Sequence, residues 1–363
     1  MNTTAEAVSP LSLTRQTYAV RFTTPAFLGD ADQNGCWRTP PFKALLREWW
    51  RIAVAKDYGY DHRRLREAEG RLFGNAWLKD EFQRSKIMLR LERWEAGRLN
   101  QWPQDAQIFH LEVGNQGHQV GSNLYLGYGP LFFHQGHTAL RANAAIQADE
   151  TNTLRIACPK AAADGIRQTL QLMDWLGALG GRSRNGWGSL ELISEGSAPE
   201  AFQPHHHSLQ AIARPLKDCL QLDWPHALGQ DDQQRLLVWK TKQEYSQWRE
   251  VMKELARVKI AFRTALKFTS PNGQPDQRHV LAYPVTNHRV NAWGNQARLA
   301  NQLRFKVIRA GNQLTGLAYH LPCSTPDELL HRLGNAQNRF RQQQLSVWQA
   351  VHAQLDTLMN RWT

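Results

Sequence analysis

The most constraining feature of the chain is the order in which the spacing of its apolar residues changes along the first half. Alternation with a period of two is typical of half-buried strands, and a period of 3.6 is typical of amphipathic helices. The shorter period predicts strands at residues 14–27, 85–94, 108–113, 154–158 and 189–194. The longer period predicts helices at residues 41–56, 61–73 and 162–179. The main elements therefore follow the order strand, helix, strand, strand, helix, strand.

That order is the one found in ferredoxin-like (RRM-like) domains. Residues 195–207 are poor in apolar residues and rich in turn formers, so they predict a linker. The second half carries weaker signals. They predict a strand at 209–215, a helix at 231–255, strands at 258–268 and 280–284, a hairpin of 298–309 and 313–321 closed by Gly311 and Asn312, and helical structure at 326–362. We expect an α+β fold with two ferredoxin-like domains in tandem and with insertions, the first over residues 1–195 and a more diverged second one over residues 208–363.

The charge of the chain favours a polyanionic partner. Lysine and arginine number 44 against 32 acidic residues, which gives a net charge of +12. No apolar run approaches the ~18 residues that a membrane-spanning helix needs, and the first twelve residues lack the pattern of a secretory signal. The four cysteines are far apart, and His205, His206 and His207 have no partners at metal-ligand spacing. We expect a soluble, cytoplasmic protein that binds nucleic acid and needs no membrane, metal or cofactor.

Residues 38–51 form the first of two informative motifs. In a helix, lysine and arginine would lie one turn apart on one face, opposite a face of apolar side chains. Cations beside an aromatic ring suit a sugar-phosphate backbone with unstacked bases, although a basic stripe is often only a solvated face. The RNA-binding candidates in this motif are Arg38, Lys43, Arg47, Trp50 and Arg51.

Residues 180–188 form the second motif, a glycine-rich segment between a predicted helix and a predicted strand. Its four glycines permit positive φ angles and a close approach of a backbone or phosphate. It matches neither the Walker pattern nor the dinucleotide-binding pattern. Two arginines supply charge, an asparagine supplies donors and a tryptophan offers a stacking face. The RNA-binding candidates here are Gly180, Gly181, Arg182, Arg184, Asn185, Gly186, Trp187 and Gly188.

These motifs together resemble the RAMP superfamily of CRISPR proteins. The likeness is strongest to the family of first-numbered, tandem-domain RAMP subunits of the Cmr (type III-B) effector complex. It rests on R-x-P-x-x-K-x-x-L-R-x-W-W-R at residues 38–51, E-G-R-L-F-G at residues 69–74 and the glycine-rich segment through Ser189. Residues 298–322 are loosely similar to the second domain of that family.

The resemblance implies a non-catalytic, RNA-binding subunit at the end of the Cmr filament. Such a subunit holds the 3′ region of the CRISPR RNA and meets the target RNA, with other RAMP subunits as partners. The residues agree with this role, because net charge gives sequence-independent affinity for phosphates. A base-reading code is unnecessary where pairing between guide and target does the discrimination.

The alternative is a RAMP endoribonuclease that processes CRISPR RNA or cleaves target RNA. RNA cleavage needs a base near the 2′-hydroxyl and an acid at the leaving oxygen. No spacing in the sequence fixes such a pair, so we do not expect an enzyme. The candidates for this chemistry are Asp30, Asp32, His110, His118, His134 and His137.

Overall fold

The structure is a computed structural model that describes residues 12–77, 82–114, 116–197, 201–203 and 205–362. The prediction that the chain begins without a secretory signal rests mainly on residues 1–11, which lie outside this part. Residues 198–200 and 204 of the predicted linker also lie outside it. Among the described helices, none is both long and apolar enough to cross a membrane.

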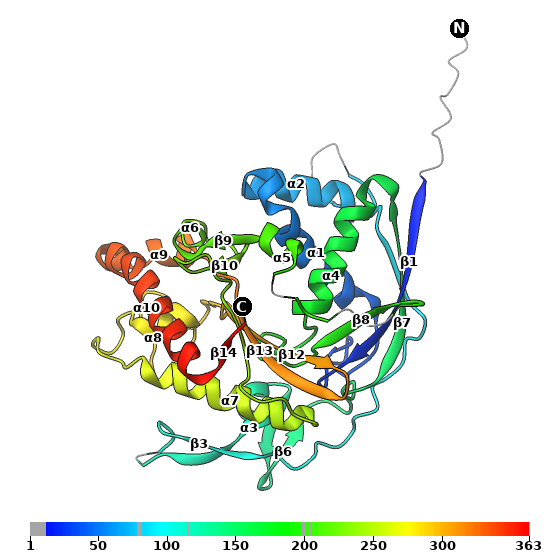
Figure 1. Ribbon diagram of the computed structural model, residues 1–363. Helices are drawn as coiled ribbons and strands as arrows, with labels where there is room; N and C mark the ends of the chain where they lie inside the picture. The colour runs from blue at the N-terminus through cyan, green and yellow to red at the C-terminus, as the bar shows by residue number, and fades with distance from the viewer. Residues whose placement is uncertain (1–11, 78–81, 115, 198–200, 204, 363) are drawn as a thin grey trace.

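The first half is built on a four-stranded antiparallel sheet (Figure 1). Its strands lie in the order β2-β7-β1-β8. The bounds are Leu13–Phe22 for β1, Met88–Leu91 for β2, Thr151–Pro159 for β7 and Leu190–Ser194 for β8. The predicted strands over these segments are thus confirmed, with shorter bounds for three of them and longer bounds for β7.

Two helices, α1 (Thr39–Val54) and α4 (Ala163–Leu176), pack against each other beside the first sheet. Proline in the first turn of α1 suits a helix start, because its missing N–H has no partner there in any case. After the 3-10 turn η1 (Ala55–Tyr58), α2 (His62–Phe73) begins where Asp61 accepts bonds from the backbone N–H groups of Arg63 and Arg64. The turn η2 (Lys160–Ala162) leads into α4.

An insertion of two hairpins and a short helix separates β2 from β7. Its elements are β3 (Gln107–His110), β4 (His118–Gly121), α3 (Ser122–Gly127), β5 (Leu131–His134) and β6 (His137–Leu140). In Figure 1 this insertion lies beneath α7 of the second half, and α3 and β3 both contact α7.

The second half contains a second four-stranded antiparallel sheet, in the order β12-β13-β11-β14. Its strands are β11 (Val238–Lys240), β12 (Leu303–Ala310), β13 (Gln313–His320) and β14 (Asn360–Arg361). The two long helices are α7 (Trp248–Ala265) and α10 (Gln337–Leu358). The smaller elements are α5 (His207–Ala211), β9 (Ala213–Pro215), α6 (Leu216–Cys219), β10 (Leu228–Gln230), α8 (Gln277–Leu281), α9 (Asp327–His331) and η3 (Gly334–Ala336).

Several expectations for the second half are wrong, although the hairpin of β12 and β13 is confirmed. The predicted helix at 231–255 is β11 followed by the first part of α7, and the predicted strand at 258–268 is mostly the remainder of α7. Alternate residues of α7, from Val258 to Thr264, are buried because β13, α10, α3 and β3 contact different sides of this helix. The predicted strand at 280–284 begins in the last two residues of α8 and continues with only an isolated bridge at Tyr283, and that at 209–215 begins as α5.

The α+β class is confirmed, and the two halves pack closely together. One buried cluster combines α1 and α4 residues with Leu317, Tyr319 and Leu321 of the second half. A second cluster combines Leu126 and Trp187 of the first half with α7. Both hydrophobic cores therefore draw side chains from both halves, and the domain boundaries at 1–195 and 208–363 stay a prediction.

Candidate nucleic-acid interface

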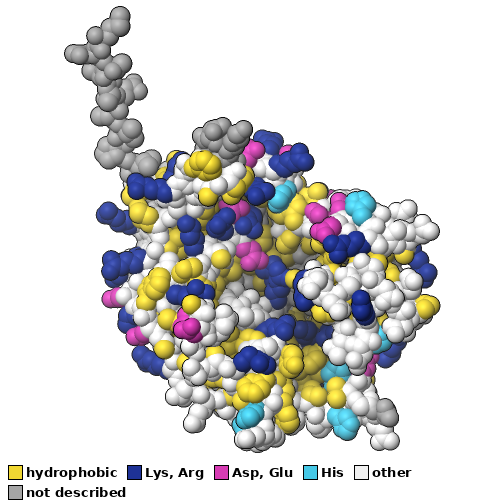
Figure 2. All heavy atoms as spheres, turned by 180° about the vertical axis from the view of Figure 1, so that it is seen from behind, with side chains coloured by type: hydrophobic (Ala, Val, Ile, Leu, Met, Phe, Trp, Pro, Cys, Tyr) yellow, Lys and Arg dark blue, Asp and Glu magenta, His cyan; other side chains and the backbone are white. Residues whose placement is uncertain are grey.

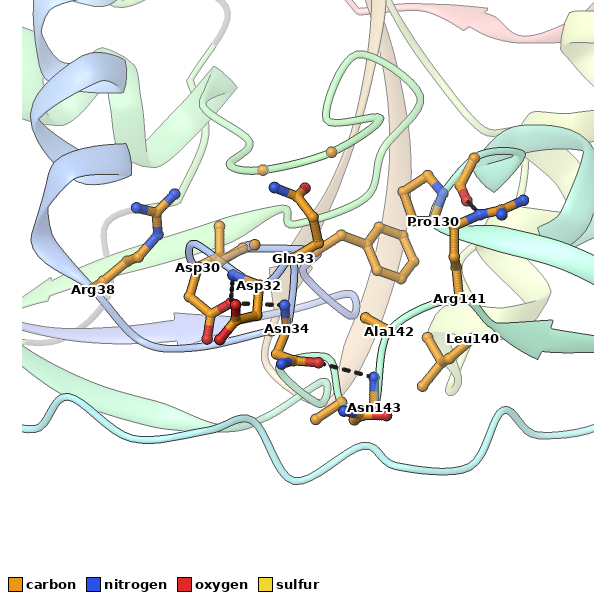
Figure 3. Close-up of a pocket in the computed structure, with 18 of the residues that line it drawn as sticks. Asp30, Asp32, Gln33, Asn34, Arg38, Pro130, Leu140, Arg141, Ala142 and Asn143 are labelled. Atoms are coloured by element: carbon orange, nitrogen blue, oxygen red, sulfur yellow. Dashed lines mark hydrogen bonds between the residues drawn. The ribbon is translucent and has the colours of Figure 1, made fainter.

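A cleft of about 970 Å³ lies where the loop after β1 meets the insertion and the glycine-rich segment (Figure 3). Arg38, which precedes α1, and Arg141, which follows β6, stand on opposite sides of this cleft in Figure 3. Gly180 and Gly181 line it as well. The cleft thus joins Arg38 and Pro41 of the first motif to Gly180 and Gly181 of the second, and it adds Arg141, which the sequence did not indicate.

Asp30 and Asp32 lie between the two arginines. One carboxylate oxygen of Asp30 accepts bonds from the backbone N–H groups of Asp32 and Asn34, both at 2.9 Å. This is the geometry of an Asx turn, in which the side chain fixes its own loop. Gly35 completes the wall, since a Cβ atom there would lie 2.5 Å from the carbonyl oxygen of Ala144.

The first end of the glycine-rich segment faces the cleft. Gly180 has a φ of +97°, and a Cβ atom at this position would lie 2.6 Å from the carbonyl oxygen of Phe27. The backbone N–H of Gly181 donates to that oxygen at 2.9 Å. Arg182 is exposed, and its Nε donates to the carbonyl oxygen of Tyr128 at 2.6 Å. Arg182 is therefore a third arginine beside the cleft.

The second end of the segment is packed between the two halves. The side-chain amide of Asn185 donates to the carbonyl oxygen of Leu126 at 2.7 Å and accepts from Lys259 Nζ at 2.7 Å. Burial lowers the pKa of Lys259 to about 7. Gly186, with a φ of +91°, lies against Met252. The expectation that Asn185 offers its donors to a ligand is wrong for this arrangement, because the amide already has protein partners.

Trp187 is fully buried, so the prediction that it presents an open stacking face is wrong for this arrangement. Its ring lies 5.3 Å from that of Phe27, 5.4 Å from that of Trp102 and 5.8 Å from that of Trp248. These rings come from the loop after β1, the insertion and α7. Trp187 therefore belongs to the core shared by the two halves. The neighbouring Gly188 is also buried.

The basic residues of α1 meet a partner that the sequence did not reveal. Arg47 Nε lies 2.5 Å from Glu69 Oε1, and Arg51 Nε lies 2.6 Å from Glu69 Oε2. The Glu69 side chain is only 5% exposed, whereas those of Arg47 and Arg51 are 36% and 41% exposed. Burial by itself would raise the pKa of Glu69, but the bonds and charges of Arg51 and Arg47 outweigh it and lower that pKa.

The two arginines thus share one carboxylate and still reach solvent. Lys43 is half-buried on the same helix, and its burial, together with the charge of Arg47, lowers its pKa. The E-G-R-L-F-G element of the sequence contains Glu69, but nothing local to it indicates an ion pair with a helix some twenty residues earlier.

Lys43, Arg47 and Arg51 form the basic row of α1, and Trp50 does not present an exposed ring beside it. It is 6% exposed and packs edge-on against Phe73 of α2, with ring centres 5.7 Å apart. The α2 helix covers part of the face of α1 that was expected to be exposed, so the predicted stacking role of Trp50 is wrong for this arrangement. Trp49 is fully buried, as its place on the apolar face predicts.

Basic side chains gather around a hollow on one face of the molecule. Figure 2 shows lysine and arginine side chains bordering this hollow, with fewer acidic side chains among them. Among the described residues, no three histidine, cysteine or acidic side chains are grouped as metal ligands. The described surface around this hollow is therefore mainly basic (Figure 2).

Residues 20–191 match the family model of the RAMP superfamily. The match covers β2, β7, α1, α4 and the glycine-rich segment in full. This segment is therefore similar to the RAMP superfamily, as its motifs predict. No curated protein matches the chain.

Two solved structures of CRISPR proteins are similar to the chain at low sequence identity. Cmr1 from Pyrococcus furiosus in its apo form is 14% identical, with 86% of this chain and 90% of that chain covered and a TM-score of 0.48. A chain in the structure of the type III-B Cmr-beta bound to cognate target RNA is 10% identical. There the match covers 90% of this chain and 99% of that chain, with a TM-score of 0.50. This second likeness shows a common fold.

Proposed function

We propose that this protein is an RNA-binding subunit of a type III-B CRISPR (Cmr) effector complex. In this role it holds the 3′ region of the CRISPR RNA and the guide–target duplex near the filament end, in antiviral defence in the cytoplasm. The observation that carries the proposal is a cleft flanked by three arginines within a RAMP-superfamily domain. The similar Cmr-beta chain, from a structure bound to target RNA, supports CRISPR RNA, target RNA and other RAMP subunits as partners.

We also propose that each half is a ferredoxin-like domain. When the four strands of each sheet are numbered by their order along the chain, both sheets have the spatial order two, three, one, four. In each half a helix follows the first strand, α1 or α7, and another precedes the last strand, α4 or α10. This is the β-α-β-β-α-β arrangement of the ferredoxin-like fold, and it supports a tandem origin of the two halves.

RNA binding by this site depends on phosphate contacts. Arg38 and Arg141 line the cleft, Arg182 lies beside it, and the basic residues of α1 begin at Lys43, about one turn beyond Arg38. Guanidinium groups bind phosphate oxygens through paired N–H donors, whatever the base sequence. Binding should therefore be steeply salt-dependent and tolerant of sequence.

Changing Arg38, Arg141 and Arg182 together to glutamine should weaken single-stranded RNA binding for every sequence. It should also lower the slope of log affinity against log salt by about three units, one for each lost phosphate contact. Titration of a labelled RNA at several salt concentrations measures both quantities. The matched control is Arg167→Gln on α4, whose side chain is 63% exposed and pairs with Asp164. An unchanged slope in the triple variant would rule out the cleft as the RNA site.

We propose that the protein is not a nuclease, and the rival function remains testable because Asp30 and Asp32 line the cleft. Since the Asp30 carboxylate is engaged in its own loop, it is poorly placed to accept a proton from a 2′-hydroxyl. Purified protein should leave a CRISPR RNA and a guide–target duplex intact, with or without Mg²⁺, in a gel assay. Cleavage that disappears in Asp32→Asn would establish the endoribonuclease instead.

A further inference from the structure

A second group of charged residues lies at the junction of α1, the glycine-rich segment and β12. Arg304 of β12 is 7% exposed, and its Nη1 lies 2.6 Å from Oε1 of Glu48 on α1. The backbone N–H of Phe305 donates to the carbonyl oxygen of Arg184 at 3.0 Å, which places Arg184 beside Arg304. One buried guanidinium from the second half thus meets a glutamate and an arginine from the first.

Positive charge at this junction exceeds the negative charge that the protein supplies. Arg51, one turn beyond Glu48, already binds Glu69. Within the described part of the chain, the Arg184 side chain has no ion pair or hydrogen bond, and Nε of Arg304 is buried without a hydrogen-bond partner. Charges removed from water are normally paired, so the partly exposed Arg184, which has no partner among the described residues, is available to an anion.

The electrostatics of the individual groups agree with this imbalance. Burial lowers the pKa of Arg184, and the neighbouring charge of Arg304 lowers it further. Burial would raise the pKa of Glu48, yet Arg304, Arg184 and Arg51 together lower it. Among the described residues, Glu48 is thus the carboxylate that Arg184 and Arg304 share, whereas Arg51 is also bound to Glu69.

We propose that the junction of Arg184, Arg304 and Glu48 is a phosphate site that holds one phosphodiester of the bound RNA between the two halves. Arg184 is the direct ligand, because its side chain is partly exposed. Arg304 is buried next to Arg184, where it adds positive charge, and its ion pair with Glu48 holds it in place. The inference rests on the proposed function. It favours RNA over an acidic protein surface because Arg184 follows Gly180 and Gly181 of the cleft by a few residues, and Glu48 lies on the same helix as Arg47 and Arg51.

Two substitutions with opposite expected signs test the site. Arg184→Gln keeps the backbone bond to Phe305, so the melting temperature without RNA should stay the same or rise. Its affinity for single-stranded RNA should fall about tenfold, and the salt slope should fall by about one unit. Glu48→Gln keeps an acceptor for Arg304 but removes the negative charge, so RNA should bind several-fold more tightly. A purely structural role for Glu48 would not increase affinity.

The matched control is Glu328→Gln on α9, which removes an equal charge from a side chain that is 74% exposed. It should change the affinity much less than Glu48→Gln does. The assay is fluorescence anisotropy of a labelled RNA with full-length protein, between about 50 and 200 mM salt.

The outcomes separate this inference from the proposed function. If the wild-type protein binds RNA and Arg184→Gln keeps its affinity and slope, the junction is not a phosphate site, although the proposed function stands. If Arg184→Gln keeps RNA binding but no longer associates with other RAMP subunits, an acidic protein surface occupies the junction and the inference is wrong. If the wild-type protein binds no RNA at any salt concentration, both proposals fail.

Discussion

Replacing Trp49 with alanine is expected to lower the free energy of unfolding by about 3–5 kcal/mol, which is the usual cost of truncating a buried aromatic side chain in a core. Trp49 is fully buried on α1 and belongs to the cluster that α1 shares with the second half. Its ring lies 6.3 Å from that of Tyr319 on β13. The resulting cavity would therefore weaken both the packing of α1 and its contact with the second sheet.

Denaturant titration measures this effect, and two variants serve as controls. Trp94 is 62% exposed, so Trp94→Ala should change stability by no more than about 0.5 kcal/mol. Trp49→Phe should cost less than Trp49→Ala, because it keeps a ring and removes an Nε1 that has no hydrogen-bond partner among the described residues. A loss for Trp49→Ala no larger than that for Trp94→Ala would show that α1 is packed differently.

Changing Arg47 and Arg51 together to alanine is expected to reverse the pH dependence of stability that Glu69 contributes. In the wild-type protein the pKa of Glu69 is lowered, so its ionised form stabilises the fold. That stability is fully present above the unfolded pKa of about 4.3 and is lost as the pH falls through the lowered pKa.

Without the two arginines, burial acts alone and raises the pKa of Glu69. Stability should then fall as the pH rises above about 4.3, until the raised pKa is passed. The loss at neutral pH should be about 1–3 kcal/mol, less than for a fully buried pair because Arg47 and Arg51 are more than a third exposed.

Adding Glu69→Gln to the double variant removes the buried charge and should restore most of the stability at neutral pH. Thermal melts from about pH 4 to pH 8 on the wild type, the double variant and the triple variant make the comparison. Equal pH profiles for the wild type and the double variant would mean that Glu69 is not held by these arginines. RNA binding by the double variant is compared with that of the wild-type protein at a pH at which both are folded.

The local pattern of the sequence determined the first half of the fold. Alternation places Val20 and Phe22 of β1 inside and Met88 of β2 outside, and all three are found so. Helical spacing likewise places Trp49 in the core. These predictions hold because the position of a residue within a strand or an amphipathic helix sets the face on which its side chain lies. The motifs within residues 20–191 also indicated the superfamily whose model matches that segment.

The tertiary structure alone decided which residues of those motifs remain open to a ligand. Trp50 and Trp187 carry aromatic rings that could stack on a base, but α2 covers the first and α7 helps to enclose the second. The carboxylate of Glu69 and the guanidinium of Arg141 reach the basic surface from elements distant in sequence. The α7 helix showed a strand-like pattern because neighbours on several sides bury its residues.

Periodicity records which side of an element is apolar, but not what covers its other sides. The exposure of Trp50 and the ion pairs of Glu69 depend on contacts between α1 and α2, and the excess of positive charge at Arg184 and Arg304 depends on contacts between the two halves. All of these contacts form only when the chain is folded. The sequence by itself determined the main elements of the first half, the motifs that match the RAMP family model and the excess of basic residues. The packing within and between the halves decided which of the basic and aromatic side chains stay exposed.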